Sequence, residues 1–268
     1  MLKVIDTFLF YSKQSYGEDR IFCSSDFYCV IDGATPIEGQ HFYGFSSQAE
    51  WFVESIRQYF EKEHSALDFP KICSDFIKEI KQDGILDSIT EEYNLPAATI
   101  AAITQKDGML NGFSLGDCGI IVQKTDKSIL RLLDTRVSTF ANLTIKAKQK
   151  AMADNTDYRP FVKAQMKENR KKMNTEGSYW TIAPKGDFSK EFLEFHMPAN
   201  EVERCILYTD GLQQICDMCN IAISDLLTLE KPSDKIKKCI HEAVARTIEP
   251  SSHIKTIDDI GFIVIARR

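Results

Sequence analysis

Four short apolar runs of this sequence each adjoin an aspartate, and this recurring pattern limits the possible folds more than any other feature. The runs and their acids are 28–31 with Asp32, 112–115 with Asp117, 205–209 with Asp210, and 260–266 with Asp258. A further apolar run, 119–122, follows Asp117. One Asp-Gly pair after a strand is typical of a surface turn. Four strands that all carry a carboxylate at one end instead predict a shared cleft. Because clustered like charges are tolerated only around a cation, we expect a site for hard divalent ions there.

The middle of the chain predicts an antiparallel sheet. Strand-like segments follow one another at 97–104, 109–115, 119–123 and 129–133, and the first two are joined by the turn Lys106-Asp107-Gly108. Further strands are expected at 4–10, 21–23, 192–197, 205–208 and 260–266. Such a meander excludes a doubly wound nucleotide-binding fold, in which strands and helices alternate.

Helices are predicted in two pairs. Apolar residues at helical spacing indicate helices over 46–64, with Ser46 and Ser47 as caps, and from Pro70 to Gly84. A second pair is expected from Asp210 to about 229 and over 233–247. Helix pairs separated by antiparallel strands predict an α+β fold, a four-layer α-β-β-α sandwich of two packed antiparallel sheets with helices outside.

The segment 137–176 is the least regular part of the sequence, and it is basic. It carries nine lysines and arginines and four acidic residues, whereas the whole chain has a net charge of -6. A solvated helix face explains such a charge run most simply. The alternative is a flap that attracts an acidic or phosphorylated partner.

Composition excludes several classes of protein. The chain has 268 residues, 43% of them hydrophobic and 27% charged, as is usual for a globular protein. The net negative charge argues against a nucleic-acid partner, and no run approaches the ~20 apolar residues of a membrane span. Without a signal-peptide cleavage site after the first apolar run, the cytoplasm is the expected location.

The eight cysteines are expected to be free thiols, since they are scattered through apolar segments of a chain that needs no disulfides. Cys216 and Cys219 have the spacing of a zinc half-site, but no second pair of ligands accompanies them. Oxygen donors therefore dominate, and with Glu18 and Asp19 they select Mg²⁺ or Mn²⁺. Two such ions that share an aspartate and a water would suit attack on a phosphorus atom.

Five motifs together resemble those of the metal-dependent protein phosphatases, the type-2C Ser/Thr phosphatases. They are GEDR at 17–20, VIDGAT at 30–35, LGD at 115–117, YTDG at 208–211 and DDIGFIVI at 258–265. The resemblance implies a single phosphatase-like catalytic domain over 1–268, with a variable basic flap insert at about 137–176. It implies dephosphorylation of phosphoserine or phosphothreonine in proteins, and we expect a monomer. It also implies two Mn²⁺ or Mg²⁺ ions and a bridging hydroxide.

Carried over by position, the resemblance assigns a role to each candidate residue. Asp32 would bridge both ions, and Gly33 would offer its carbonyl to one of them. Asp210 and Asp258 would complete the coordination of the other ion, while Glu18 and Asp19 would bind the ions through water. Asp117 with Asp210 would match a weaker third metal site.

The sequence also departs from the family pattern. Ala34 replaces a histidine proposed to protonate the leaving oxygen, and Asp259 and Gly261 replace the usual Asn and Thr or Ser. The phosphate-holding arginine before the Glu-Asp pair is absent, and Lys13 is the nearest cation. These departures leave open a catalytically weak or inactive phosphatase-like binding or regulatory module. A phosphatase of small metabolites is a further alternative, because the basic segment favours an acidic partner without indicating its size.

Overall fold

A computed structural model describes residues 2–12, 16–38, 42, 44–62, 68–247 and 257–267 of the chain. These residues form two five-stranded sheets, with the strand orders β1-β10-β9-β6-β7 and β2-β3-β4-β5-β8. Every strand pair is antiparallel, as the sequence predicts. The predicted meander over 97–133 is wrong as a single sheet, because β4 and β5 belong to one sheet and β6 and β7 to the other. The strands are β1 (Leu2–Phe10), β2 (Asp19–Cys23), β3 (Phe27–Gly33), β4 (Ala98–Lys106), β5 (Met109–Leu115), β6 (Gly119–Lys124), β7 (Ile129–Leu132), β8 (Leu193–Pro198), β9 (Val202–Tyr208) and β10 (Ile260–Arg267).

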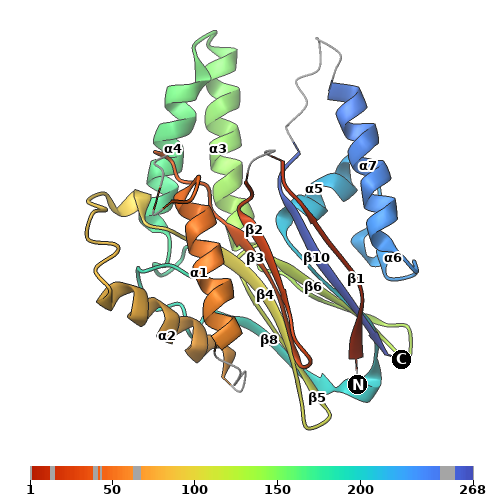
Figure 1. Ribbon diagram of the computed structural model, residues 1–268. Helices are drawn as coiled ribbons and strands as arrows, with labels where there is room; N and C mark the ends of the chain where they lie inside the picture. Colours follow the sequence, from red (N-terminus) through yellow and green to blue (C-terminus); the bar gives the residue numbers. More distant parts are fainter. Residues whose placement is uncertain are drawn as a thin grey trace.

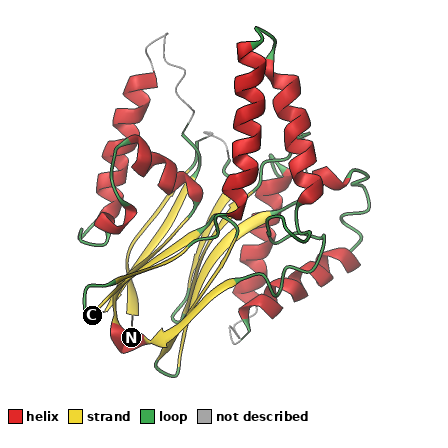
Figure 2. Ribbon diagram, turned by 180° about the vertical axis from the view of Figure 1, so that it is seen from behind, coloured by secondary structure: helices red, strands yellow, loops and turns green. Residues whose placement is uncertain are grey.

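Helices cover the outer face of each sheet (Figure 1). The helices are α1 (Gln48–Lys62), α2 (Phe69–Gln82), α3 (Arg136–Ala153), α4 (Tyr158–Lys172), α5 (Asp210–Met218), α6 (Ile223–Leu226) and α7 (Pro232–Thr247), with short 3₁₀ turns η1 (Glu92–Asn94) and η2 (Ala199–Glu201). Buried side chains form one cluster under α1 and α2, one between the sheets and one under α5, α6 and α7. The view from behind shows the same layers (Figure 2). The predicted four-layer α-β-β-α sandwich is therefore confirmed.

Strand β3 shows why the segment before Asp32 is apolar at every position. Phe27, Cys29 and Ile31 pack into the cluster under α1 and α2. Tyr28 and Val30 pack into the cluster between the two sheets. Successive side chains of a strand point to opposite faces, so a strand covered on both faces needs apolar residues throughout. Asp32 consequently lies near the end of a rigid, buried strand.

The predicted helix starts are confirmed for α1 and α2. The hydroxyl of Ser47 accepts a hydrogen bond from the backbone N–H of Glu50 at 3.0 Å, as an N-cap does. Asp68 caps α2 by accepting from the N–H of Lys71, and Pro70 lies in its first turn.

The expectation of an irregular segment at 137–176 is wrong. Helices α3 and α4 lie side by side and project beyond the sheets; we call this pair, residues 136–172, the flap hairpin (Figure 1). Each helix has a single buried residue, Ala151 in α3 and Asn169 in α4. Neither helix therefore has the wide apolar stripe by which a sequence signals a helix packed on a core.

The helix predicted from Asp210 to about 229 is too long. Helix α5 ends at Met218, and α6 begins only at Ile223. Between them Asn220 has a φ of 54°, the left-handed conformation that asparagine tolerates better than most residues and that commonly ends a helix.

All eight cysteines are free thiols, as predicted. Six of them are buried, Cys219 is half-buried and Cys23 is exposed. Within the described ranges, the structure contains no helix with both the length and the apolar character needed to cross a bilayer.

Candidate active site

Three neighbouring strands of the β2-β3-β4-β5-β8 sheet place polar residues at the same end. Asp19 begins β2, and it pairs directly with Asp32 of β3. On the other side of β3, Thr99 of β4 is the partner of Asp32. Residues that face each other across an antiparallel pair have Cβ atoms about 5 Å apart. Strand register alone therefore holds the carboxylates of Asp19 and Asp32 close together.

The other sheet brings three more acids to this end. Asp210 is the first residue of α5 and follows β9, whereas Asp117 and Asp258 shortly precede β6 and β10. Strand β9 lies between β6 and β10 and is antiparallel to both, with Tyr208 paired to Gly119 of β6. The end of β9 therefore meets the beginnings of both neighbours. This topology brings together acids that are far apart in the sequence.

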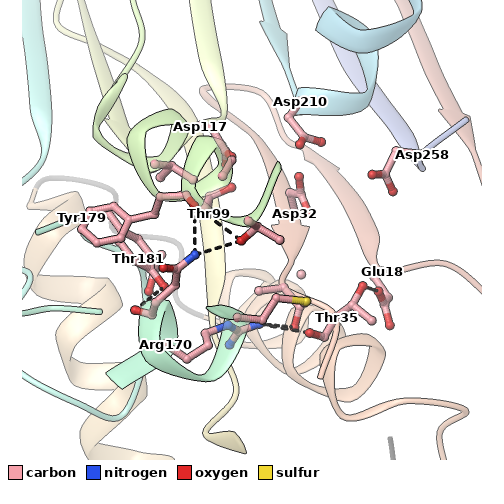
Figure 3. Close-up of a pocket in the computed structure, with 18 of the residues that line it drawn as sticks. Glu18, Asp32, Thr35, Thr99, Asp117, Arg170, Tyr179, Thr181, Asp210 and Asp258 are labelled. Carbon is pink, nitrogen blue, oxygen red and sulfur yellow. Dashed lines mark hydrogen bonds between the residues drawn. The ribbon is translucent and has the colours of Figure 1, made fainter. Parts of the chain in front are cut away.

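The acids of the two sheets line one cavity of about 310 Å³ (Figure 3). Its lining includes all of the residues for which the sequence predicts a metal-binding role, namely Glu18, Asp19, Asp32, Gly33, Asp117, Asp210 and Asp258. Glu18 and Asp19 are buried, Asp32 is half-buried, and Asp210 and Asp258 are exposed. The cavity thus has a buried acidic floor and an acidic rim open to solvent. The role of these residues as metal ligands stays a prediction.

Burial and mutual repulsion perturb the acids on the floor. The pKa of Asp32 is raised well above its usual value by burial and by the nearby charges of Asp19 and Asp210. Burial likewise raises the pKa of Asp19, although a hydrogen bond from Thr209 opposes this effect. The pKa of Asp117 is raised mainly by burial. Carboxylates in such surroundings ionise at low cost only beside positive charge.

The donor atoms fit a hard divalent cation. Among the described residues, no histidine or cysteine lines the cavity, so its candidate ligands are oxygens, which Mg²⁺ and Mn²⁺ prefer. Among the described residues, no three or more His, Cys, Asp or Glu side chains are grouped closely enough to hold a metal ion as they stand. The acids face one another across the cavity instead (Figure 3). This open arrangement suits Mg²⁺-like ions, which keep several water ligands.

Gly33 permits a close backbone approach between two of the motifs. Its N–H donates to the carbonyl oxygen of Glu18 at 2.9 Å. A Cβ atom at Gly33 would lie 2.8 Å from that oxygen and 2.8 Å from a methyl group of Val53. Any side chain would therefore force β3 away from Glu18, whether or not a metal is bound.

Hydrogen bonds fix Glu18 and explain the unusual Asp259. The carboxylate of Glu18 accepts from the hydroxyls of Ser47, at 2.8 Å, and Thr35. One oxygen of Asp259 accepts from the N–H and the hydroxyl of Ser12, at 2.7 and 2.8 Å. Its other oxygen accepts from the N–H of Glu18 at 2.6 Å. Asp259 thus fastens the segment around Glu18 to the start of β10.

Gly261, the other departure in the last motif, acts through its backbone. Its N–H donates to the hydroxyl oxygen of Thr209 at 2.9 Å, and that hydroxyl donates to Asp19 at 2.7 Å. A relay of two hydrogen bonds therefore orients the buried carboxylate of Asp19 from the adjoining sheet.

Sequence reasoning missed the residues that the flap hairpin and the loop after it contribute to the cavity. Arg170 of α4 is the only lysine, arginine or histidine among the described residues of its lining, and Tyr179 and Thr181 lie close by (Figure 3). Arg170 was only one of nine basic residues in its segment, and no spacing distinguishes it. Lys13, the cation nearest to the Glu-Asp pair in sequence, lies outside the described residues.

Known proteins resemble this chain in sequence pattern and in fold. A family model described as Protein phosphatase 2C matches residues 12–255. A search of curated proteins gave no match. The serine/threonine phosphatase PstP/Ppp of Mycobacterium tuberculosis is 12% identical, with a TM-score of 0.57 and coverage of 99% of this chain and 98% of that one.

Two further solved structures show the same likeness. PppA of Pseudomonas aeruginosa, a regulatory component of its T6SS, is 10% identical, with a TM-score of 0.57 and coverage of 99% and 96% of the two chains. Stp1 of Staphylococcus aureus, a serine/threonine phosphatase, is 14% identical, with a TM-score of 0.50 and coverage of 100% and 94%. At these identities, the three structures are evidence for the fold alone.

Proposed function

Because this chain belongs to the protein phosphatase 2C family, we propose that it is a Mn²⁺- or Mg²⁺-dependent phosphomonoester hydrolase that acts on phosphoserine or phosphothreonine in proteins. The observation that carries the proposal is the single cavity in which acids from both sheets meet. Its all-oxygen donors and acidic floor are what metal-assisted attack on a phosphate ester needs.

Each acid has a position that suits its proposed role. Asp32, on the floor, would bridge two ions, and the carbonyl of the neighbouring Gly33 would bind one of them. Asp210 and Asp258, at the rim, would hold the other ion. The hydrogen-bonded Glu18 and Asp19 would act through water. Asp117 with Asp210 is the proposed place of a third ion.

When bound, the ions supply a water activated near neutral pH and offset the charge of the phosphate. The protein residues hold the site in shape: Asp259 anchors Glu18, and Thr209 orients Asp19. Ala34 offers no proton, and no histidine of the described residues lines the cavity. We therefore propose that the leaving oxygen takes its proton from solvent.

The flap hairpin favours a negatively charged protein substrate. Helix α3 contains Lys146, Lys148 and Lys150 and no acidic residue. In α4, Lys163 and Lys167 pair with Glu38 at 3.1 and 2.7 Å, close to the loop after β3. We propose that a phosphorylated protein binds beside these helices.

Free thiols throughout the chain support a reducing compartment, and we propose the cytoplasm as the location. We also propose that the chain is one catalytic domain that acts as a monomer.

Hydrolysis of a phosphothreonine peptide in the presence of Mn²⁺ tests the proposal. Asp210→Asn should lower kcat at least about a hundredfold, since a metal ligand supports several kcal/mol of transition-state stabilisation. Asp217→Asn, an exposed change on the same helix, should leave kcat unchanged. Undiminished turnover by the Asp210 variant would reject the assignment.

A second candidate function is a phosphatase-like binding or regulatory module. The observation that favours it is Ala34, together with the absence of a histidine from the described lining of the cavity. It predicts that the wild-type protein binds Mn²⁺ and phosphopeptide but releases no phosphate. Titration calorimetry beside the activity assay distinguishes the two functions.

A further inference from the structure

Arg170 is an unusual cation for its position. Its Nη2 group donates to the carbonyl oxygens of Ala34 and Thr35, both at 3.1 Å, and its Nη1 group donates to that of Leu95 at 3.4 Å. All three acceptors are backbone atoms, and within the described residues no carboxylate forms an ion pair with Arg170. A guanidinium has five N–H donors, so two remain for a ligand.

Burial does not neutralise Arg170. Removal from water lowers the pKa of Arg170, yet a guanidinium stays protonated at neutral pH. Arg170 therefore carries a positive charge into a cavity whose other described charged residues are all acids, and the charge of Glu18 is near enough to stabilise it. Figure 3 shows Arg170 beside Thr35 and Glu18, on the side of the cavity away from Asp210.

Thr181 gives an independent indication of a ligand on the same wall. Thr181 is only 3% exposed and lines the cavity, and its hydroxyl has no hydrogen-bond partner among the described residues. Its backbone is fixed on both sides by Asn174, which accepts from the N–H at 2.8 Å and donates to the carbonyl at 2.9 Å. A buried hydroxyl without a partner is costly in free energy, so a bound group that satisfies it is the natural explanation.

We infer that Arg170 and Thr181 together bind the phosphoryl group of the substrate, so that the flap hairpin and the loop after it supply the anion contacts. The ligand class is the phosphate group of a phosphomonoester, or inorganic phosphate as the product. A tetrahedral phosphate has enough oxygens to face the acid-bound ions and a guanidinium at the same time. This inference rests on the proposed function of the cavity.

The test is direct binding of inorganic phosphate to the full chain in the presence of Mn²⁺, measured by titration calorimetry. Arg170→Gln should weaken phosphate binding about tenfold or more, because it removes charge-assisted hydrogen bonds. Thr181→Val should weaken it about fivefold or more. Arg170→Lys, which keeps the charge but loses the planar fork, should fall between wild type and Arg170→Gln.

Two matched controls separate phosphate binding from structural effects. Arg159→Gln removes an exposed arginine from the first turn of the same helix. Ser178→Ala removes another buried, unpartnered hydroxyl that faces a different cavity. Both controls should bind phosphate as wild type does.

Arg170→Gln can also loosen the flap hairpin, because three backbone carbonyls lose their hydrogen-bond donor. If Arg170→Gln fails to fold, Thr181→Val tests the inference alone. Its backbone bonds are retained, and its Tm should not fall. Phosphate affinity equal to wild type in Thr181→Val would overturn the inference. The two proposals can fail separately. If the wild-type protein cleaves no ester but the variants still bind phosphate more weakly than wild type, the proposed function is rejected and the inference stands.

Discussion

At the scale of single residues, hydrogen bonds to neighbouring segments hold the acids of the motifs in place. Asp259 stands where the family pattern has Asn, and both of its oxygens accept backbone or hydroxyl donors from the segment around Glu18. An asparagine has only one acceptor oxygen. The carboxylate at Asp259 is therefore matched to the three donors that surround it.

Asp259→Asn should lower the free energy of unfolding by about 1–2 kcal/mol, because the new amide N–H₂ would face one of these donors and leave it buried without a partner. Urea denaturation measures the change. Asp126→Asn is the matched control, since a single oxygen of Asp126 accepts both hydrogen bonds from Ser128 and an amide retains that oxygen. Equal stability of the Asp259 variant and wild type would show that the site tolerates the usual Asn.

Local motifs reveal some residues of the cavity and not others. Asp32 and Asp210 can be predicted because each follows an apolar strand and precedes a glycine. Arg170 and Thr181 cannot, since their place depends on how the flap hairpin packs on the loop after Gly33. A local sequence pattern cannot predict a contact between residues that are 136 positions apart.

At the scale of elements, α1 is joined to β2 through a partly buried ion pair. Arg20 follows the Glu-Asp pair in β2, and its Nε donates to Glu54 of α1 at 2.8 Å. Burial raises the pKa of Glu54, but hydrogen bonds from Arg57 and Arg20 outweigh this effect and lower the pKa to about 2. The helix thus supports the strand that carries Asp19.

Glu54→Gln should destabilise the protein by about 1 kcal/mol at neutral pH, a figure that allows for solvent screening. The pKa of Glu54 in the folded protein lies below 4.5, the ordinary value of a glutamate. The contribution of Glu54 is therefore fully present above pH 4.5 and is lost as the pH falls toward 2. Urea unfolding at several pH values should show the difference from wild type shrinking on acidification.

The control for this change is Glu61→Gln on the same helix. Glu61 pairs with Arg57 at 3.2 Å but is 57% exposed, so its removal should have little effect at any pH. A difference between Glu54→Gln and wild type that stays constant down to low pH would contradict the account.

The presence of a helix was predicted where the helix packs on a sheet, although the predicted end of α5 was wrong, and it was missed where the helix does not pack on a sheet. The stripe of α1 faces a buried cluster, and its core residues recur at helical spacing. The flap hairpin has exposed apolar side chains instead, including Ile145, Met152 and Phe161. The periodicity rule detects burial on one face, so it cannot find a helix whose faces are mostly in solvent.

At the scale of the whole molecule, the two sheets act as a frame for one acidic cavity. Their packing and antiparallel pairing were predictable from strands separated by helix pairs. The strand order was not, because β5 pairs with the distant β8 and β6 with the distant β9. The convergence of the strand ends follows from β9 lying between β6 and β10. The flap hairpin forms one wall of this cavity, and among the described residues of the lining Arg170 is the only basic one.

The central claim is that these acids bind paired divalent ions, and titration of the metal-free protein with Mn²⁺ tests it most directly. We predict that wild type binds about two ions per chain and that Asp32→Asn loses both, since the bridging carboxylate serves both. Asp107→Asn, in the exposed turn between β4 and β5, should bind as wild type does. No binding of Mn²⁺ by wild type, or unchanged binding by Asp32→Asn, would contradict the account.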